Sequence, residues 1–117
     1  MRPQGSSPAT QTFLDFSMKK YYVVINDQYG GFHIGKKLSE FLKQTHNMTD
    51  EEIYGLGDHS KRCDKRLIEG VRLLKLVCPE SLKDLEIEEI NTPAYTIEEY
   101  DGKEAVYPVY CNVIFDQ

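Results

Sequence analysis

Residues 21–32, YYVVINDQYGGF, determine how this chain begins to fold. The run over residues 21–25 is almost continuously apolar and rich in β-branched residues, which is typical of a strand covered on both faces. After Asn26, the pair Gly30 and Gly31 permits the positive φ angles of a tight turn. The stretch therefore predicts a central strand of a sheet, followed by a glycine turn into the next element.

Helical patterns follow this turn. Apolar residues at i, i+4, i+7 and i+8 from Ile34 predict a helix that ends near residue 45. A Thr-x-x-Glu capping box predicts a short helix over residues 49–54. Asp64 can accept hydrogen bonds from first-turn amides, so it predicts the start of a longer helix that Pro79 stops.

Strand patterns fill the rest of the chain. Residues 85–90 alternate between apolar and acidic side chains, as a half-buried strand does. Residues 95–100 and 103–107 flank Asp101-Gly102, a pair suited to the type I′ turn of a β-hairpin. A last alternation over 109–115 predicts a short final strand after Pro108.

The element order β-α-(α)-α-β-β-β predicts an α+β fold. Because helices join the first strand to the second, we expect these two strands to be parallel and the later ones antiparallel. This gives a mixed sheet of about four to five strands with two to three helices. The length of the chain allows one domain, which we place at residues 18–117. The Pro-, Ser- and Thr-containing residues 1–17 are expected to be a disordered leader.

Composition narrows the class of protein. Hydrophobic residues make up 40% of the chain and charged residues 28%, which is typical of a soluble folded domain. No apolar run has the length of a membrane span, and no secretory pattern opens the chain, so we expect no membrane association and an intracellular location. The three cysteines, Cys63, Cys78 and Cys111, are expected to be reduced thiols.

The net charge of −5 is unevenly distributed. Residues 1–80 carry twelve Lys and Arg against ten acids, whereas residues 81–117 carry two against nine. A balance of −7 in the last third would repel a phosphate backbone, which disfavours nucleic acid as a partner.

Four segments together resemble a group of small uncharacterised proteins of bacteriophages and large DNA viruses: YYVVINDQYGGFHI, RCDKRLIEGV, LEIEEI and YTIEEYDGKE. The resemblance covers residues 19–104 and implies a viral accessory protein, which would act in the host cytoplasm. The chain has Lys65 where many relatives have Pro, and Gly35 where they have Ser or Thr. Residue by residue, the resemblance falls on Asn26, Gly30, Gly31, Phe32, Arg62, Asp64, Glu98, Tyr100, Asp101 and Gly102.

Two candidate sites emerge from residue chemistry. A strand, a glycine-rich turn and a helix start can bind phosphate, although YGGFHIGKK lacks the spacing of known phosphate loops, and Phe32 is expected to fill the core beneath the turn. A hard cation such as Mg²⁺ or Ca²⁺ could be held by the hairpin acids, Glu98, Glu99, Asp101 and Glu104, together with Glu86 and Glu88. Alternation, however, sends Glu98 and Glu99 to opposite faces, which favours a solvated sheet face. Arg62 could form a site pair with Asp64, two residues later, or simply lie at the start of the helix that Asp64 caps. The cap is the favoured interpretation, which leaves Arg62 itself without an assigned structural role. We predict no cofactor and no metal.

Two functions remain open. The favoured hypothesis is a non-enzymatic viral accessory protein that binds an unidentified protein partner through an acidic, Tyr-rich hairpin sheet. The alternative is a small ligand-binding domain, or an enzyme of metal-assisted phosphate chemistry, built on the GGF turn, Arg62 and the hairpin acids. The sequence carries no catalytic signature, and its candidate ligand-binding residues are Asn26, Gly30, Gly31, Phe32, Arg62, Asp64, Tyr100 and Asp101.

Overall fold

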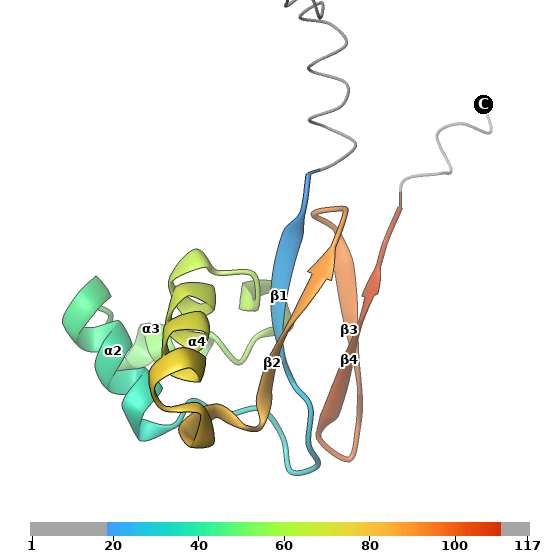
Figure 1. Ribbon diagram of the computed structural model, residues 1–117. Coiled ribbons are helices and arrows are strands. Elements are labelled where there is room, and N and C mark those ends of the chain that lie inside the picture. Colours follow the sequence, from blue (N-terminus) through green and yellow to red (C-terminus); the bar gives the residue numbers. More distant parts are fainter. Residues whose placement is uncertain (1–18, 111–117) are drawn as a thin grey trace, which may run out of the picture.

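Strand β1 (Tyr21–Asn26) lies between two layers of the molecule (Figure 1). The computed structural model describes residues 19–110. Val24 packs against the helices on one side, while Val23 and Ile25 pack against the hairpin on the other. All three side chains are at most 3% exposed. The continuous apolar run of β1 is thus explained by burial on both faces, as its sequence predicts.

The order of elements is the predicted one, and the α+β class is confirmed. After β1 come helices α2 (Lys36–His46) and α3 (Asp50–Gly55), the 3₁₀ helix η1 (His59–Lys61), helix α4 (Lys65–Val77), the 3₁₀ helix η2 (Pro79–Leu82), and strands β2 (Leu85–Ile90), β3 (Tyr95–Tyr100) and β4 (Lys103–Pro108).

Two of the helices begin at the predicted caps. The Thr49 hydroxyl accepts a hydrogen bond from the Glu52 backbone N–H, and the Glu52 carboxylate accepts one from the Thr49 N–H, which completes a capping box. The Asp64 carboxylate accepts from the N–H groups of Arg66 and Leu67 at the start of α4. These helix starts are local in origin, because each cap lies within three residues of the groups it satisfies.

Strands β1 and β2 pair antiparallel, so the expectation of a parallel pair was wrong. The direction of β2 follows from the point at which the helical segment brings the chain back to β1. The Asp27 N–H, just after β1, donates to the Asp84 carbonyl, just before β2, over 2.8 Å. Strand β2 therefore starts beside the end of β1 and must run in the opposite direction. A parallel pair would need a crossover that returned the chain to the start of β1.

The strands form two separate two-stranded ladders, β1–β2 and β3–β4, and the expected single mixed sheet is corrected accordingly. The predicted β3–β4 hairpin is present, with Asp101 at φ 53° and Gly102 at φ 91° in its turn. Helices α2 and α4 pack on one side of the β1–β2 ladder and the hairpin lies on the other (Figure 1).

Some predictions fall outside the part of the chain that the structure describes. They are the leader at residues 1–17 and all but the start of the strand over 109–115. Within residues 19–110, none of the helices combines the length and apolar character that crossing a membrane requires.

Candidate functional site

The end of β1 is joined to the hairpin by the buried side chain and backbone of Asn26. Its Nδ2 donates to the carbonyls of Gln28 at 2.6 Å and Gly102 at 2.7 Å. Its backbone N–H donates to Glu104 Oε1 at 2.8 Å. Asn26 is 2% exposed, so each of these polar groups must find its partner inside the protein. Asn26 thus holds the glycine turn and the hairpin in a fixed relation.

Arg62 is the largest fully buried side chain in the described part of the chain, and it faces Glu104. Its Nη1 lies 2.6 Å from Glu104 Oε1, and its Nη2 lies 2.9 Å from Oε2, a two-point ion pair between η1 and β4. The side chains of both residues are 2% exposed. Because the two charges compensate each other, the pair can remain ionised without contact with water.

The remaining N–H groups of Arg62 also have acceptors. Nε donates to the Leu56 carbonyl at 3.1 Å, Nη2 to Gly57 at 3.0 Å, and Nη1 to Val24 at 3.4 Å. The five N–H groups of a guanidinium are therefore matched by five hydrogen bonds. Arg62 has no donor left to offer a ligand.

Phe32 covers this ion pair. The guanidinium carbon of Arg62 lies 3.6 Å from the centroid of the Phe32 ring, a close cation–π contact. The ring is half-buried and also packs against the main core. The expected core role of Phe32 is thus accompanied by a stacking contact with Arg62.

The glycine turn packs directly on the hairpin turn. The Gly30 N–H donates to the Asp101 carbonyl at 3.1 Å. A Cβ atom on Gly102 would lie 2.3 Å from the Gly31 nitrogen and 2.6 Å from the Gly30 nitrogen, so only glycine fits there. The Gly30 N–H is therefore already bonded within the protein, and the two turns pack backbone against backbone. These contacts favour a structural turn over the phosphate site considered from the sequence.

Two candidate residues lie apart from the others. Asp64 caps α4 and pairs with Arg66 at 2.9 Å. Hydrogen bonding from the Arg66 side chain lowers the pKa of Asp64 below its usual value. Tyr100 is 76% exposed and contacts the Tyr29 ring edge-on, with the ring centroids 6.4 Å apart. The structure therefore brings six of the eight candidates together around Glu104 and the two turns: Asn26, Gly30, Gly31, Phe32, Arg62 and Asp101.

Glu104 is the important residue that the sequence interpretation left out of the site. A signal for it existed, since alternation from the Asp101-Gly102 turn places Glu104 on the same hairpin face as the apolar Val106. An acidic residue on a buried face needs a cationic partner. Arg62, which had no assigned role, was the available partner.

The only group of potential metal ligands in residues 19–110 also contains Glu104. Its ligand atoms, on His59, Glu99 and Glu104, all lie within 4.8 Å of one another. Glu104 Oε2 is 3.9 Å from His59 Nε2, but it already binds the Arg62 guanidinium at 2.9 Å. A cation bound there would lie next to the positive charge of Arg62, which opposes binding.

Tyr95 secures the backbone of this region. Its hydroxyl donates to the His59 carbonyl at 2.6 Å, which joins β3 to η1. Burial, together with the neighbouring Cys63 thiol, raises the pKa of Tyr95 to about 12. The hairpin is thus attached to the rest of the protein at its turn, next to the turn through Glu104, and at its start through Tyr95.

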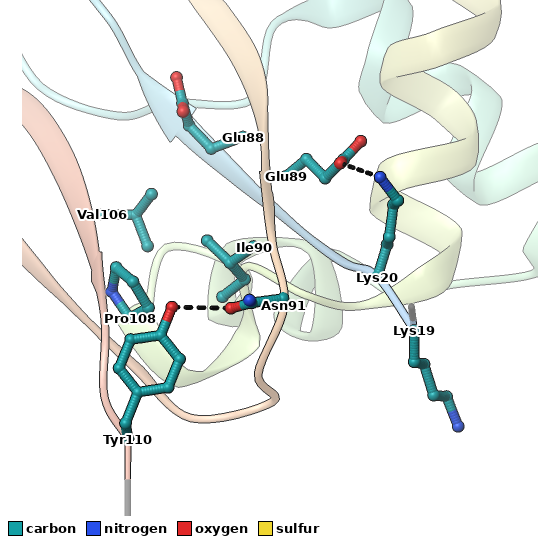
Figure 2. A pocket seen from close by; sticks show the side chains of 9 residues that line it. All are labelled: Lys19, Lys20, Glu88, Glu89, Ile90, Asn91, Val106, Pro108 and Tyr110. Atoms are coloured by element: carbon teal, nitrogen blue, oxygen red, sulfur yellow. Dashed lines mark hydrogen bonds and ion pairs between the residues drawn. The ribbon is translucent and has the colours of Figure 1, made fainter. Parts of the chain in front are cut away.

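A groove of about 620 Å³ lies away from the Arg62–Glu104 pair, where the start of β1 meets the ends of β2 and β4. Figure 2 shows that an ion pair from Lys20 to Glu89, 2.8 Å long, lies on one side, and a hydrogen bond from Tyr110 to Asn91, 2.7 Å long, on the other. The groove contains none of the candidate site residues, and two of its charged residues, Lys20 and Glu89, bind each other.

Comparison with known proteins finds no match to a family model, to a curated protein or to a solved structure. The function must therefore be argued from the geometry of the chain itself.

Proposed function

We propose that this protein is a non-enzymatic binding protein that engages a protein partner through the exposed face of its hairpin. We call this surface the outer hairpin face. Its strand residues point away from β1, because the residues that alternate with them pack inward. The members of the outer hairpin face are Tyr29, Thr96, Glu98, Tyr100, Lys103, Ala105 and Tyr107.

The observation that carries the proposal is the exposure of three tyrosines on this face. Tyr29 is 62% exposed, Tyr100 76% and Tyr107 50%. Large aromatic rings left in water on a folded surface are typical of interfaces, where their apolar area is buried and their hydroxyls find partners. Tyr29 also contacts Tyr100, and the Lys103 ammonium lies 5.8 Å from the Tyr29 ring, so these side chains form one patch.

The support beneath this patch also favours binding. The Arg62–Glu104 pair, Asn26 and Tyr95 hold the hairpin from its inner side. A rigid surface loses little conformational entropy on association, so more of its contact energy appears as affinity. The acidic residues are less concentrated than the sequence suggests, because Glu104 is buried against Arg62 and Glu99, although exposed, lies on the inner side of the hairpin beside it. We therefore propose a partner with an apolar, hydrogen-bonding surface rather than a basic one.

The alternative, a ligand-binding domain or an enzyme using the GGF turn, Arg62 and the hairpin acids, would need groups free to act. Arg62 and Glu104 bind each other, and the Gly30 amide binds Asp101. The charged and hydrogen-bonding groups that this alternative would use are thus already engaged in holding the fold. The resemblance to small viral proteins supports a viral or host protein as the partner.

The test is affinity capture with the full chain, followed by calorimetric titration of the captured partner. Tyr100→Ala/Tyr107→Ala removes two exposed rings, and Tyr54→Ala is the matched control, since Tyr54 is 88% exposed on α3. The hairpin variant should bind the partner with a dissociation constant at least about tenfold higher than that of the wild type, because interface tyrosines are frequent hot spots. The control should bind like the wild type. Equal binding by all three proteins would contradict the proposal.

A further inference from the structure

Helix α4 carries an exposed apolar strip that its own fold does not use. Leu73 is 42% exposed and Leu76 is 82% exposed, although the other side of the helix is fully buried. With Tyr22 of β1 they line a shallow hollow of about 440 Å³. Large aliphatic side chains gathered in this way on a surface indicate an interaction site.

The surface has a regular outline, which we call the α4 stripe. Its positions follow the spacing i, i+3, i+4, i+7, i+8 and i+11, so they share one side of the helix over three turns, about 16 Å. The residues of the α4 stripe are Lys65, Ile68, Glu69, Arg72, Leu73 and Leu76.

We propose that the occupant of the α4 stripe is the α4 stripe of a second copy, packed antiparallel about a two-fold axis. In one register each residue meets a chemically complementary one. Glu69 meets Arg72 of the second copy, and the aliphatic stem of Lys65 covers Leu76. Leu73 lies over Ile68 of the second copy, which is only 9% exposed and belongs mainly to the core of its own chain. A two-fold axis makes every one of these contacts twice. The charge pattern of the stripe is therefore complementary to itself when reversed.

A parallel arrangement lacks this complementarity. It would place Glu69 beside Glu69 and Arg72 beside Arg72, and like charges at such distances repel. The antiparallel register is the one that turns both repulsions into attractions.

The two charged residues are available for these contacts. Arg72 is exposed, and its guanidinium carbon lies 4.4 Å from the Tyr22 ring centroid, which holds the side chain while leaving its N–H edges open. Glu69 is exposed and pairs with His46 through Oε1 at 2.9 Å. Its other carboxylate oxygen can accept from the arginine of a second copy.

The stripe is small for an interface. Three helical turns bury less than the roughly 1,200 Å² of a standard stable complex, so the dimer should be weak and concentration-dependent. We expect dissociation in the micromolar range, on the order of 1–100 μM. This surface lies on the helical layer, away from the outer hairpin face, and its test is independent of any partner.

Sedimentation velocity of the full chain over a concentration series tests the proposal. The wild type should shift from monomer to dimer as concentration rises. Leu76→Lys should weaken the dimer by at least about tenfold, because it places a positive charge against Lys65 of the other copy in both contacts. Tyr54→Lys is the matched control, since it adds the same charge at a similarly exposed site on α3. It should leave the dimer unchanged.

Charge reversal tests the register itself. Glu69→Arg and Arg72→Glu should each weaken the dimer about tenfold, because each creates two like-charged contacts. The double variant Glu69→Arg/Arg72→Glu restores opposite charges and should return to within about twofold of the wild type. A double variant as weak as the two singles would overturn the antiparallel register.

Two further results would overturn the proposal as a whole. One is a wild type that remains monomeric at every concentration. The other is a monomer whose unfolding midpoint falls in Leu76→Lys but not in Tyr54→Lys, since this would mean that another segment of the same chain covers the α4 stripe.

Discussion

The buried pair of Arg62 and Glu104 should dominate the stability of this fold. Glu104→Gln removes the negative charge while keeping the shape of the side chain and an acceptor for the Asn26 N–H. It leaves the Arg62 guanidinium buried without a counter-charge, which costs about 3–5 kcal/mol in such sites. Small domains are stable by about 5–15 kcal/mol, so the variant loses a large share of its stability. At about 4–8 °C per kcal/mol, the melting temperature should fall by at least roughly 12 °C.

The assay is urea unfolding followed by circular dichroism, with Arg62→Met and the double variant Arg62→Met/Glu104→Gln completing a cycle. The double variant removes both charges, so it should be more stable than the sum of the single effects predicts, by about 2 kcal/mol. Glu89→Gln is the control. Glu89 Oε2 lies 2.8 Å from Lys20 Nζ, a distance similar to those in the Arg62–Glu104 pair, but both side chains are about half exposed. This change should leave the urea midpoint close to that of the wild type, because solvent and salt screen an exposed pair.

Two results would refute the reasoning. A loss below about 1 kcal/mol in Glu104→Gln would mean that water reaches the pair and solvates Arg62. Strict additivity of the two substitutions would mean that the residues do not interact across the hairpin.

Three other predictions concern the turn, a helix cap and a titration. Gly30→Ala should cost about 1–3 kcal/mol, because Gly30 has a φ of 113° although its surroundings are open. Gly102→Ala should cost clearly more, because its Cβ would also lie 2.3 Å from a backbone nitrogen; equal urea midpoints would contradict this. Asp64→Ala should cost about 1 kcal/mol near neutral pH. Since hydrogen bonding from Arg66 lowers the pKa of Asp64 below 3.8, that contribution is complete above pH 3.8 and is lost as pH falls through the lowered pKa, so the gap between the two proteins should close in acid. The pKa of Tyr95 is raised from 10.0 to about 12, so its phenol stabilises the fold fully below pH 10 and loses this effect as pH rises towards 12. Tyr95→Phe should remove the last tyrosine to ionise in an ultraviolet titration, and a titration curve unchanged at its alkaline end would rule this out.

The candidate site illustrates how far sequence reasoning reaches. The glycine turn and Arg62 were singled out for local features, two adjacent glycines and an arginine not needed for a cap, and Asn26 because the family resemblance falls on it. The structure brings these residues together. Glu104 was treated as part of a solvated acidic face, because its partner lies 42 positions away along the chain and no periodic pattern links them.

The amino-acid sequence by itself determined the elements of this protein and most of their boundaries. Helix caps, the Asp101-Gly102 turn and the alternation of the strands depend on groups within a few residues of each other, so they can be recognised without knowing the fold. Only the tertiary structure decided the direction of β2, the division into two ladders and the pairing of Arg62 with Glu104. These features depend on where the packed helices return the chain, and that is set by contacts between residues far apart in the sequence.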